Sequence, residues 1–299
     1  MITRVKKCCL LRNFSIFSDN QNTLVRLQMK KNRLALFAIL CSSALWGQQD
    51  VQFTQFANNK IFYNPGVIGS GDAICLSAAH RSQWVGFENA PTTQNFSANI
   101  PINFLHGGVS VNFSNDIIGY FQDITAGVGY GYQMDLAGGV LGLGIRADFR
   151  NKNITSGVWA PPQTMNDPSL VGFGNSSMAT DLSFGAYFRA DNWYTGLSST
   201  RLLETKDLIG TVSGGSLAQI RGQRHYYLMG GYDLDLENGF VLQPAIMVKS
   251  DLVTTQLDLN VAAMYNNQLW GGVTYRVNDA FAVMAGYQLT KDLRATYSY

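Results

Sequence analysis

Apolar side chains alternate with small or polar ones over much of the chain. Between residues 123 and 149, every second position from Ile124 to Met134 is apolar, and the positions between them hold Thr, Gly or Gln. The alternation breaks at Leu136–Gly139 and then resumes as far as Phe149. A period of two places successive side chains on opposite faces of a strand, so this stretch predicts a hairpin with one apolar and one polar face.

The same alternation recurs from residue 73 to the last residue, without helical periodicity. It predicts strands at residues 73–83, 93–102, 107–114, 122–134, 140–150, 180–189, 193–199, 225–236, 240–249, 256–265, 269–276, 281–289 and 293–299. The even-numbered connections between these strands are short, whereas the long ones, at residues 85–93, 151–179 and 200–224, are all odd-numbered. An up-and-down sheet with one smooth and one elaborated end is typical of outer-membrane barrels.

Composition favours a membrane barrel over a soluble β-sandwich or propeller, which would also alternate. Only 14% of the residues are charged, against about 25% in an average soluble protein. No apolar run reaches the 18 or so residues of a membrane helix, so any insertion must come from strands. We therefore predict an all-β fold, a transmembrane up-and-down antiparallel β-barrel over residues 73–299.

The strand count is odd, which is a difficulty for a closed barrel. Single-chain bacterial barrels close with an even number of strands, because the first and last must run antiparallel. The sequence therefore predicts about 13 strands present of 14, with the final strand lacking. A miscounted strand and a strand donated by another chain are the alternatives.

Residues 29–47 have the layout of a secretory signal peptide, with Lys30, Lys31 and Arg33 before an apolar run. Since such signals begin a chain, residues 1–28 are predicted to be an over-extension before Met29. A lipoprotein signal at Cys41 is disfavoured by the bulky Leu40 before it. Residues 48–299 carry 14 basic and 19 acidic side chains, a net charge of −5, which does not suggest a nucleic-acid partner.

Residues 48–72 lack clean alternation and precede the first strand. They are predicted to form either a plug inserted into the barrel or a periplasmic docking arm, with a tight turn at Asn64-Pro65-Gly66. A filled interior would also explain why glycines occupy the inner face of the hairpin, where larger side chains or a plug would leave little room. These glycines are Gly127, Gly129, Gly131, Gly142 and Gly144.

Catalytic and cofactor motifs are not evident, so we predict that the protein is not an enzyme. The histidines, His80, His106 and His225, are scattered and lack a nucleophile motif such as GxSxG. The glycine-rich stretches lie within predicted strands, which excludes a dinucleotide fingerprint. No Cys/His cluster indicates zinc, and Asp233, Asp235 and Asp258 are interpreted as solvated interior residues rather than a calcium site. We expect no cofactor and no metal.

Several motifs together resemble a known family. They are the leader followed by "QDVQFTQF", the Asn64-Pro65-Gly66 turn, "RSQW" at Arg81–Trp84, "APTTQ" at Ala90–Gln94, and the late "AVMAGYQLTKDLRATYSY". From about residue 48 onward the chain resembles the PorP/SprF family, outer-membrane proteins of the type IX secretion system of Bacteroidetes. It departs from that pattern by ending before the closing strand usually found after the last motif.

The resemblance implies a role in secretion and surface attachment of proteins with C-terminal sorting domains, including adhesins in gliding species. It also implies contacts with periplasmic secretion components and with outer-membrane lipid. Candidate motif or partner-contact residues are Asn64, Pro65, Gly66, Arg81, Gln83, Trp84, Pro91, Thr92 and Gln94. For "RSQW", an inward Arg81 and Gln83 with an interfacial Trp84 is the purely structural alternative. The alternative functions are a passive porin for small solutes and, in a third class, an outer-membrane hydrolase.

Overall fold

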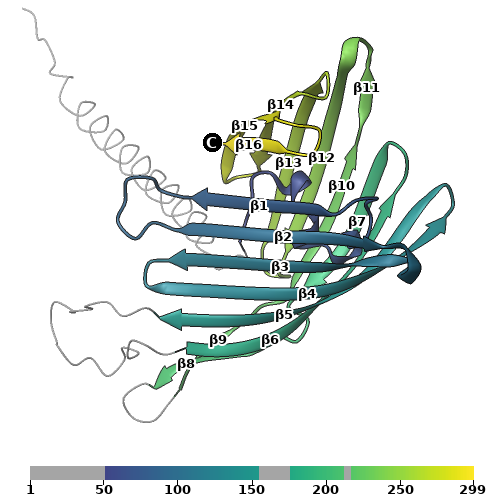
Figure 1. Ribbon diagram of the computed structural model, residues 1–299. Coiled ribbons are helices and arrows are strands. Elements are labelled where there is room, and N and C mark those ends of the chain that lie inside the picture. Colours follow the sequence, from purple (N-terminus) through teal and green to yellow (C-terminus); the bar gives the residue numbers. More distant parts are fainter. Residues whose placement is uncertain (1–50, 155–175, 212–216) are drawn as a thin grey trace, which may run out of the picture. The chain divides into compact units, whose positions relative to one another are not determined.

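The computed structural model describes residues 51–154, 176–211 and 217–299 (Figure 1). The chain divides into two units, Met1–Gln49 and Asp50–Tyr299, and every described residue belongs to the second. The predicted signal peptide at residues 29–47 and the over-extension before it lie outside the described residues. Within the described ranges, no helix is long and apolar enough to cross a bilayer.

Antiparallel strands make up most of the described chain. The main sheet contains β1 (Cys75–Ser82), β2 (Thr92–Ile102), β3 (Gly107–Ile118), β4 (Phe121–Leu136), β5 (Gly139–Ile154), β6 (Ser176–Arg189), β7 (Trp193–Thr200), β10 (His225–Tyr232), β11 (Leu234–Leu236), β12 (Phe240–Ser250), β13 (Thr255–Tyr265), β14 (Leu269–Arg276), β15 (Ala280–Gln288) and β16 (Arg294–Ser298). A separate hairpin pairs β8 (Lys206–Thr211) with β9 (Leu217–Arg221). The helical turns are η1 (Phe56–Asn58), α2 (Lys60–Tyr63), η2 (Pro65–Val67), η3 (Asn103–Leu105) and η4 (Glu237–Gly239).

The main sheet has 14 strands, and neighbours in space follow the order of the chain. Because β10 and β11 both pair with β12, they occupy one place in the order of strands across the sheet. Each of the thirteen predicted ranges overlaps one of the strands or this pair. The all-β, up-and-down antiparallel prediction is therefore confirmed. The interpretation of residues 200–224 as a plain connection was wrong, because they contain the β8–β9 hairpin.

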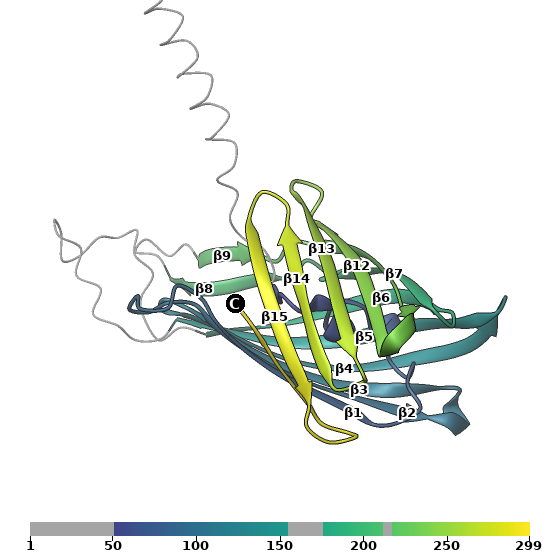
Figure 2. The same ribbon diagram turned by 90° about the horizontal axis from the view of Figure 1, so that it is seen from above.

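The sheet is not closed into a barrel: the predicted barrel is present as an open sheet, in line with the prediction that one strand is lacking. Among the described residues, β1 pairs with β2 alone and β16 pairs with β15 alone. Thirteen positions in alternating directions leave β1 and β16 parallel to each other, so their edges cannot form an antiparallel ladder. Figure 2 shows the sheet curving from β1 and β2 round to β15.

The sheet buries polar side chains on one face and exposes large apolar side chains on the other, which is the reverse of a soluble protein. One face, here called the polar face, carries buried polar side chains, among them Asn95, Ser97, Ser110, Asn112, Arg146, Ser183, Ser198, Lys249, Asp258, Asn260, Thr274 and Arg276. The other, the apolar face, exposes large hydrophobic side chains, among them Phe96, Phe113, Val128, Ile145, Phe184, Leu197, Leu228, Ile246, Val261, Val273 and Val283. Such an arrangement needs an apolar medium around the sheet.

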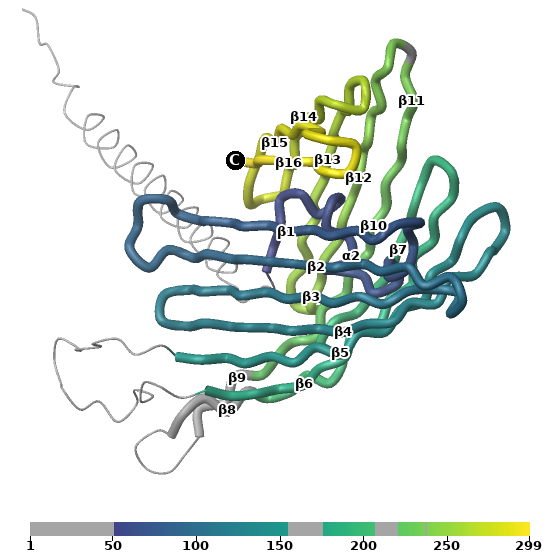
Figure 3. The backbone as a smooth tube through the Cα atoms, viewed as in Figure 1, coloured from purple at the N-terminus to yellow at the C-terminus, as the bar shows by residue number. Residues whose placement is uncertain are grey.

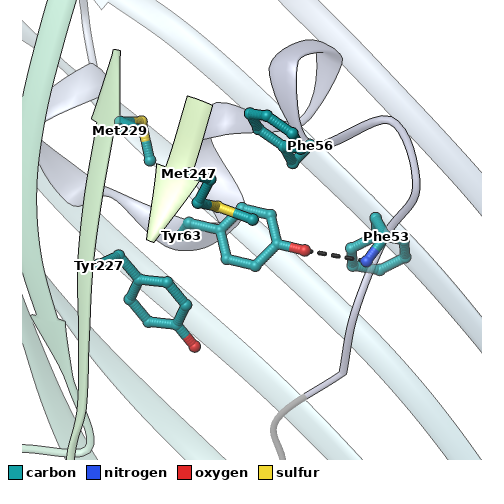
Figure 4. Packing of buried hydrophobic residues seen from close by; sticks show 6 residues of the cluster. All are labelled: Phe53, Phe56, Tyr63, Tyr227, Met229 and Met247. Atoms are coloured by element: carbon teal, nitrogen blue, oxygen red, sulfur yellow. Dashed lines mark hydrogen bonds between the residues drawn. The ribbon is translucent and has the colours of Figure 1, made fainter. Parts of the chain in front are cut away.

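Residues 51–71, here called the N-terminal segment, supply much of the buried apolar packing. Figure 3 traces this segment within the curve of the sheet. Figure 4 shows Phe53, Phe56 and Tyr63 packed with side chains of β10 and β12, namely Tyr227, Met229 and Met247. A second cluster joins Ile61, Val67 and Ile68 to Tyr187 of β6. The polar face is therefore covered by a segment from the same chain.

Candidate functional site: the N-terminal segment on the polar face

Side-chain donors of the sheet hold backbone carbonyls of the N-terminal segment. The Arg146 Nη1 atom donates to the carbonyls of Ile61 at 3.2 Å and Phe62 at 3.0 Å, and the Ser198 hydroxyl donates to that of Tyr63 at 2.8 Å. Further donors are Gln133 to the Ile68 and Gly66 carbonyls, Arg81 to Gln52, and Thr274 to Thr54. These bonds come from β1, β4, β5, β7 and β14, so the segment is tied to strands far apart in the sheet.

Asn64 fixes the turn that begins η2. Its Oδ1 atom accepts from the Gly66 amide at 2.8 Å, while its Nδ2 atom donates to the Ala186 carbonyl of β6 at 3.0 Å. Pro65 follows at the first helical position, where its fixed φ fits and its missing N–H costs nothing. All three residues of the Asn64-Pro65-Gly66 motif are buried. The motif thus joins the segment to the sheet.

Five glycines of β4, β5 and β6 let the backbone of the segment lie directly on the sheet. We call Gly129, Gly131, Gly142, Gly144 and Gly185 the glycine floor. A Cβ atom built at Gly144 would overlap the Pro65 carbonyl, and one at Gly131 would overlap the Ile68 carbonyl. The prediction that this face is crowded is confirmed. The nearest atoms at the glycine floor belong to residues 64–68, whereas Gly127 faces the side chains of Asp148 and Arg146.

Two groups of the segment have shifted pKa values because they are buried. Burial lowers the pKa of the Lys60 amine to about 8, and the nearby Asp233 opposes that effect. The Lys60 Nζ atom lies 3.6 Å from the centre of the Tyr194 ring, a cation–π contact. Burial also raises the pKa of the Tyr63 phenol, whose oxygen accepts from the Phe53 amide at 2.9 Å. Both side chains are therefore enclosed parts of the packed segment.

Buried charges on the polar face are paired with one another. Arg146 lies 2.8 Å from Asp148, and Asp258, which is fully buried, contacts Arg276 at 2.9 Å and Lys249 at 3.3 Å. The interpretation of Asp258 as a solvated residue was wrong, because two cations on neighbouring strands enclose its carboxylate. In the parts of the chain that the structure describes, no group of His, Cys, Asp or Glu is arranged to hold a metal ion.

The "RSQW" motif divides between the polar face of the sheet and the β1–β2 connection. Arg81 points to the polar face, donating to the Gln52 carbonyl at 2.7 Å. With the Gln83 amide oriented to satisfy both groups, its oxygen accepts from Arg81 Nη1 at 2.7 Å. Trp84 has a φ of 48° and is 70% exposed in the β1–β2 connection. Arg81 and Gln83 are therefore structural, whereas Trp84 is available for contacts.

The "APTTQ" motif closes the β1–β2 loop and then enters β2. The backbone N–H of Gln83 donates to the Pro91 carbonyl at 2.9 Å, and Thr92 pairs with Ser82 in the β1–β2 ladder. Gln94 lies exposed on the outer, apolar face and accepts from Asn115 of β3 at 3.1 Å. The nine candidate residues thus do not form one site. Asn64, Pro65 and Gly66 belong to the N-terminal segment, Arg81 bonds to it, and Gln83 bonds to Arg81. The others, Trp84, Pro91, Thr92 and Gln94, lie in the β1–β2 connection or in β2.

The three histidines lie in three separate structural settings. His80 contacts Ser82 at 3.1 Å on the exposed side of β1, His106 lies against the Tyr132 ring after η3, and His225 stacks on Tyr227 in β10. His106 is in an even-numbered connection, whereas His80 and His225 lie near odd-numbered ones.

The model of the PorP/SprF family, described as a type IX secretion system membrane protein, matches residues 46–299. The chain belongs to the PorP/SprF family. No curated protein matches it. The PorP/SprF match spans the N-terminal segment together with the whole main sheet, so this chain is a membrane protein of the type IX secretion system, and the segment lies within the family domain.

Replacing Asn64 with alanine should loosen the N-terminal segment of this PorP/SprF protein. The substitution leaves the part-buried Ala186 carbonyl and the buried Gly66 amide without this partner, which should cost about 1–3 kcal/mol. Asn64→Asp keeps the acceptor for Gly66 but sets a buried carboxylate oxygen against the Ala186 carbonyl, so it should lose at least as much stability as Asn64→Ala. Urea unfolding in detergent measures both. Equal stability of Asn64→Ala and the unmodified protein would contradict the role given to this side chain.

Proposed function

We propose that the protein is a plugged outer-membrane β-barrel that works without catalysis, through protein contacts at both ends. The long-loop end, which carries the odd-numbered connections, faces secreted proteins with C-terminal sorting domains or adhesins. The short-turn end faces periplasmic secretion components. The observation that carries this proposal is the N-terminal segment on the polar face, since it occupies the space that a solute channel would need.

The exposed apolar face supports insertion into a membrane through strands. In lipid, an unpaired strand edge leaves backbone groups unsatisfied at a cost of several kcal/mol each. We therefore propose that the sheet closes in the membrane through a strand antiparallel to both β1 and β16. Contacts of the N-terminal segment with both β1 and β14 support closure, because they link strands near the two open edges.

The plug is favoured over a periplasmic docking arm by the depth of its contacts. The segment is held by Asn95 and Asn99 of β2 as well as by Ser198 of β7, all in mid-strand positions. A docking arm would leave those polar side chains to solvent. Once undocked, the same segment would leave a polar lumen, which keeps the passive porin as the alternative function.

Conductance in planar bilayers separates the plugged barrel from the porin. We expect the intact protein to give few or no stable current steps, and a variant lacking residues 51–71 to give frequent ones, provided that it keeps heat-modifiable migration on gels. Large, stable steps from the intact protein would favour the porin. If the deletion variant does not fold, Gly144→Val takes its place in this test, because it is expected to detach the segment.

Co-purification in mild detergent tests the role in secretion. We expect a secreted sorting-domain protein, a periplasmic secretion component, or both to accompany the protein. Trp84→Ala, at the long-loop end, should weaken recovery of the secreted partner alone, because this side chain is 70% exposed there. Trp193→Ala, after an even-numbered connection, is the matched control. Purification without any such partner would count against the proposal.

A further inference from the structure

The apolar face changes its chemistry toward the long-loop end of β2–β5, strands that lie side by side in Figure 1. Phe96 pairs with Phe113, and Phe149 of β5 lies opposite Ala126 of β4. These three rings are 41–49% exposed and form an aromatic row. Two residues closer to the long loops, the outward side chains of β2, β3 and β5 are carboxamides instead of aromatic rings.

These carboxamides come from four adjacent strands and form one patch. Gln94 of β2 pairs with Asn115 of β3, and Gln122 of β4 pairs with Asn153 of β5. The fifth residue is Asn151, which lies two residues before Asn153 on the same strand. Asn115 donates to Gln94 at 3.1 Å and accepts from Gln122 at 2.8 Å. We call these five residues the amide patch. Their hydrogen-bonding capacity far exceeds these two bonds, so the patch can bind a polar ligand.

The position of the amide patch matches the edge of the hydrocarbon layer. Along β5, the outward apolar side chains run from Leu141 to Phe149, about nine residues or roughly 30 Å of strand, and Asn151 is the next outward residue. At a tilt of about 40° this spans roughly 23 Å, close to the apolar band of about 25 Å in outer-membrane barrels. The patch begins just beyond it, at the depth of the lipid headgroups.

The patch carries no charge, and this selects among headgroup ligands. Its five side chains are neutral, and the outward positions between them hold Ile117 and Ile124. Phosphate is recognised mainly through Arg and Lys, whereas neutral amides offer paired donors and acceptors. Neutral hydroxyl groups, which also donate and accept, are the complementary ligand. Sugar residues of a glycolipid headgroup present such groups at this depth.

We propose that the amide patch binds the sugar headgroups of outer-leaflet glycolipid next to the protein. This inference rests on the proposed outer-membrane location with the long loops outside. The aromatic row contacts the acyl boundary, and the patch immediately beyond it holds the sugars. One wall of the protein, β2–β5, thereby binds a preferred lipid.

The test uses the full chain reconstituted in nanodiscs with lipopolysaccharide that carries its core oligosaccharide, or with phosphatidylethanolamine, whose headgroup has no sugar. Lipid retained per protein is counted by native mass spectrometry. We expect several-fold more core-bearing lipid than phosphatidylethanolamine on the unmodified protein. Gln94→Ala/Asn115→Ala/Gln122→Ala should lose most of this preference, and the exposed turn variant Gln268→Ala should keep it.

Two results would overturn the proposal. One is equal retention of core-bearing lipid by the triple variant and the unmodified protein, and the other is equal retention of both lipids by the unmodified protein. Heat-modifiable migration of the triple variant verifies that it is folded. The co-purification and conductance experiments address the proposed function separately, so a failure here leaves their outcomes interpretable.

Discussion

Replacing Gly144 with valine is expected to detach the N-terminal segment while leaving the main sheet assembled. A Cβ atom at this position would overlap backbone atoms of Pro65, which cannot move aside as the end of a flexible side chain could. We expect proteolytic cleavage within residues 51–71 to accelerate at least about tenfold, equivalent to about 1.4 kcal/mol of lost docking energy. Limited proteolysis of the reconstituted protein, followed by mass spectrometry, locates the cuts.

Gly230→Val provides the matched control on β10. A Cβ atom there would meet its nearest neighbour, the Tyr194 carbonyl, at 3.5 Å, an ordinary contact distance. We expect this variant to be cleaved at the rate of the unmodified protein. If Gly144→Val also resisted cleavage and gave no conductance, the segment would not depend on the glycine floor. If both variants failed to assemble, glycine would be needed for the strands rather than for docking.

The strands and their faces could be predicted because they depend on local alternation. Ile124–Met134 shows a period of two in sequence, and the exposed Val128 and Tyr130 lie on the face that this period predicts. The glycines of β4 and β5 were also informative, since their positions between apolar residues indicated a close approach. The sequence left open whether larger side chains or a plug approaches them, because Pro65 and Gly144 are far apart in the chain.

Other features were missed because they arise only when strands are placed in register. Asp258 looks like an ordinary polar strand residue in the sequence, and only the pairing with β12 and β14 brings Lys249 and Arg276 beside it. The amide patch similarly combines Gln94 with Asn115 across the β2–β3 ladder. The β8–β9 hairpin lacks the long apolar alternation of the main strands, so its residues resembled a connection.

Replacing Arg146 with methionine should be among the most destabilising single changes in the sheet. This guanidinium is 6% exposed, and it holds the Ile61 and Phe62 carbonyls as well as the Asp148 carboxylate. Removing one partner of a buried ion pair typically costs about 3–5 kcal/mol, because the remaining charge is left uncompensated. Urea unfolding of the protein in lipid vesicles measures this loss. Arg294→Met, on an exposed side chain of β16, should change stability by less than about 0.5 kcal/mol.

A double variant identifies which of the Arg146 contacts matters. In Arg146→Met/Asp148→Leu the partly buried carboxylate is gone, so stability should recover in part if the uncompensated charge causes most of the loss. If the lost bonds to Ile61 and Phe62 dominate, the double variant should stay as unstable as Arg146→Met, and its N-terminal segment should be cleaved rapidly. Full stability of Arg146→Met would contradict both explanations. Because the same guanidinium bonds to the segment and to the sheet, its loss should weaken docking and folding together, whereas Gly144→Val should weaken docking alone.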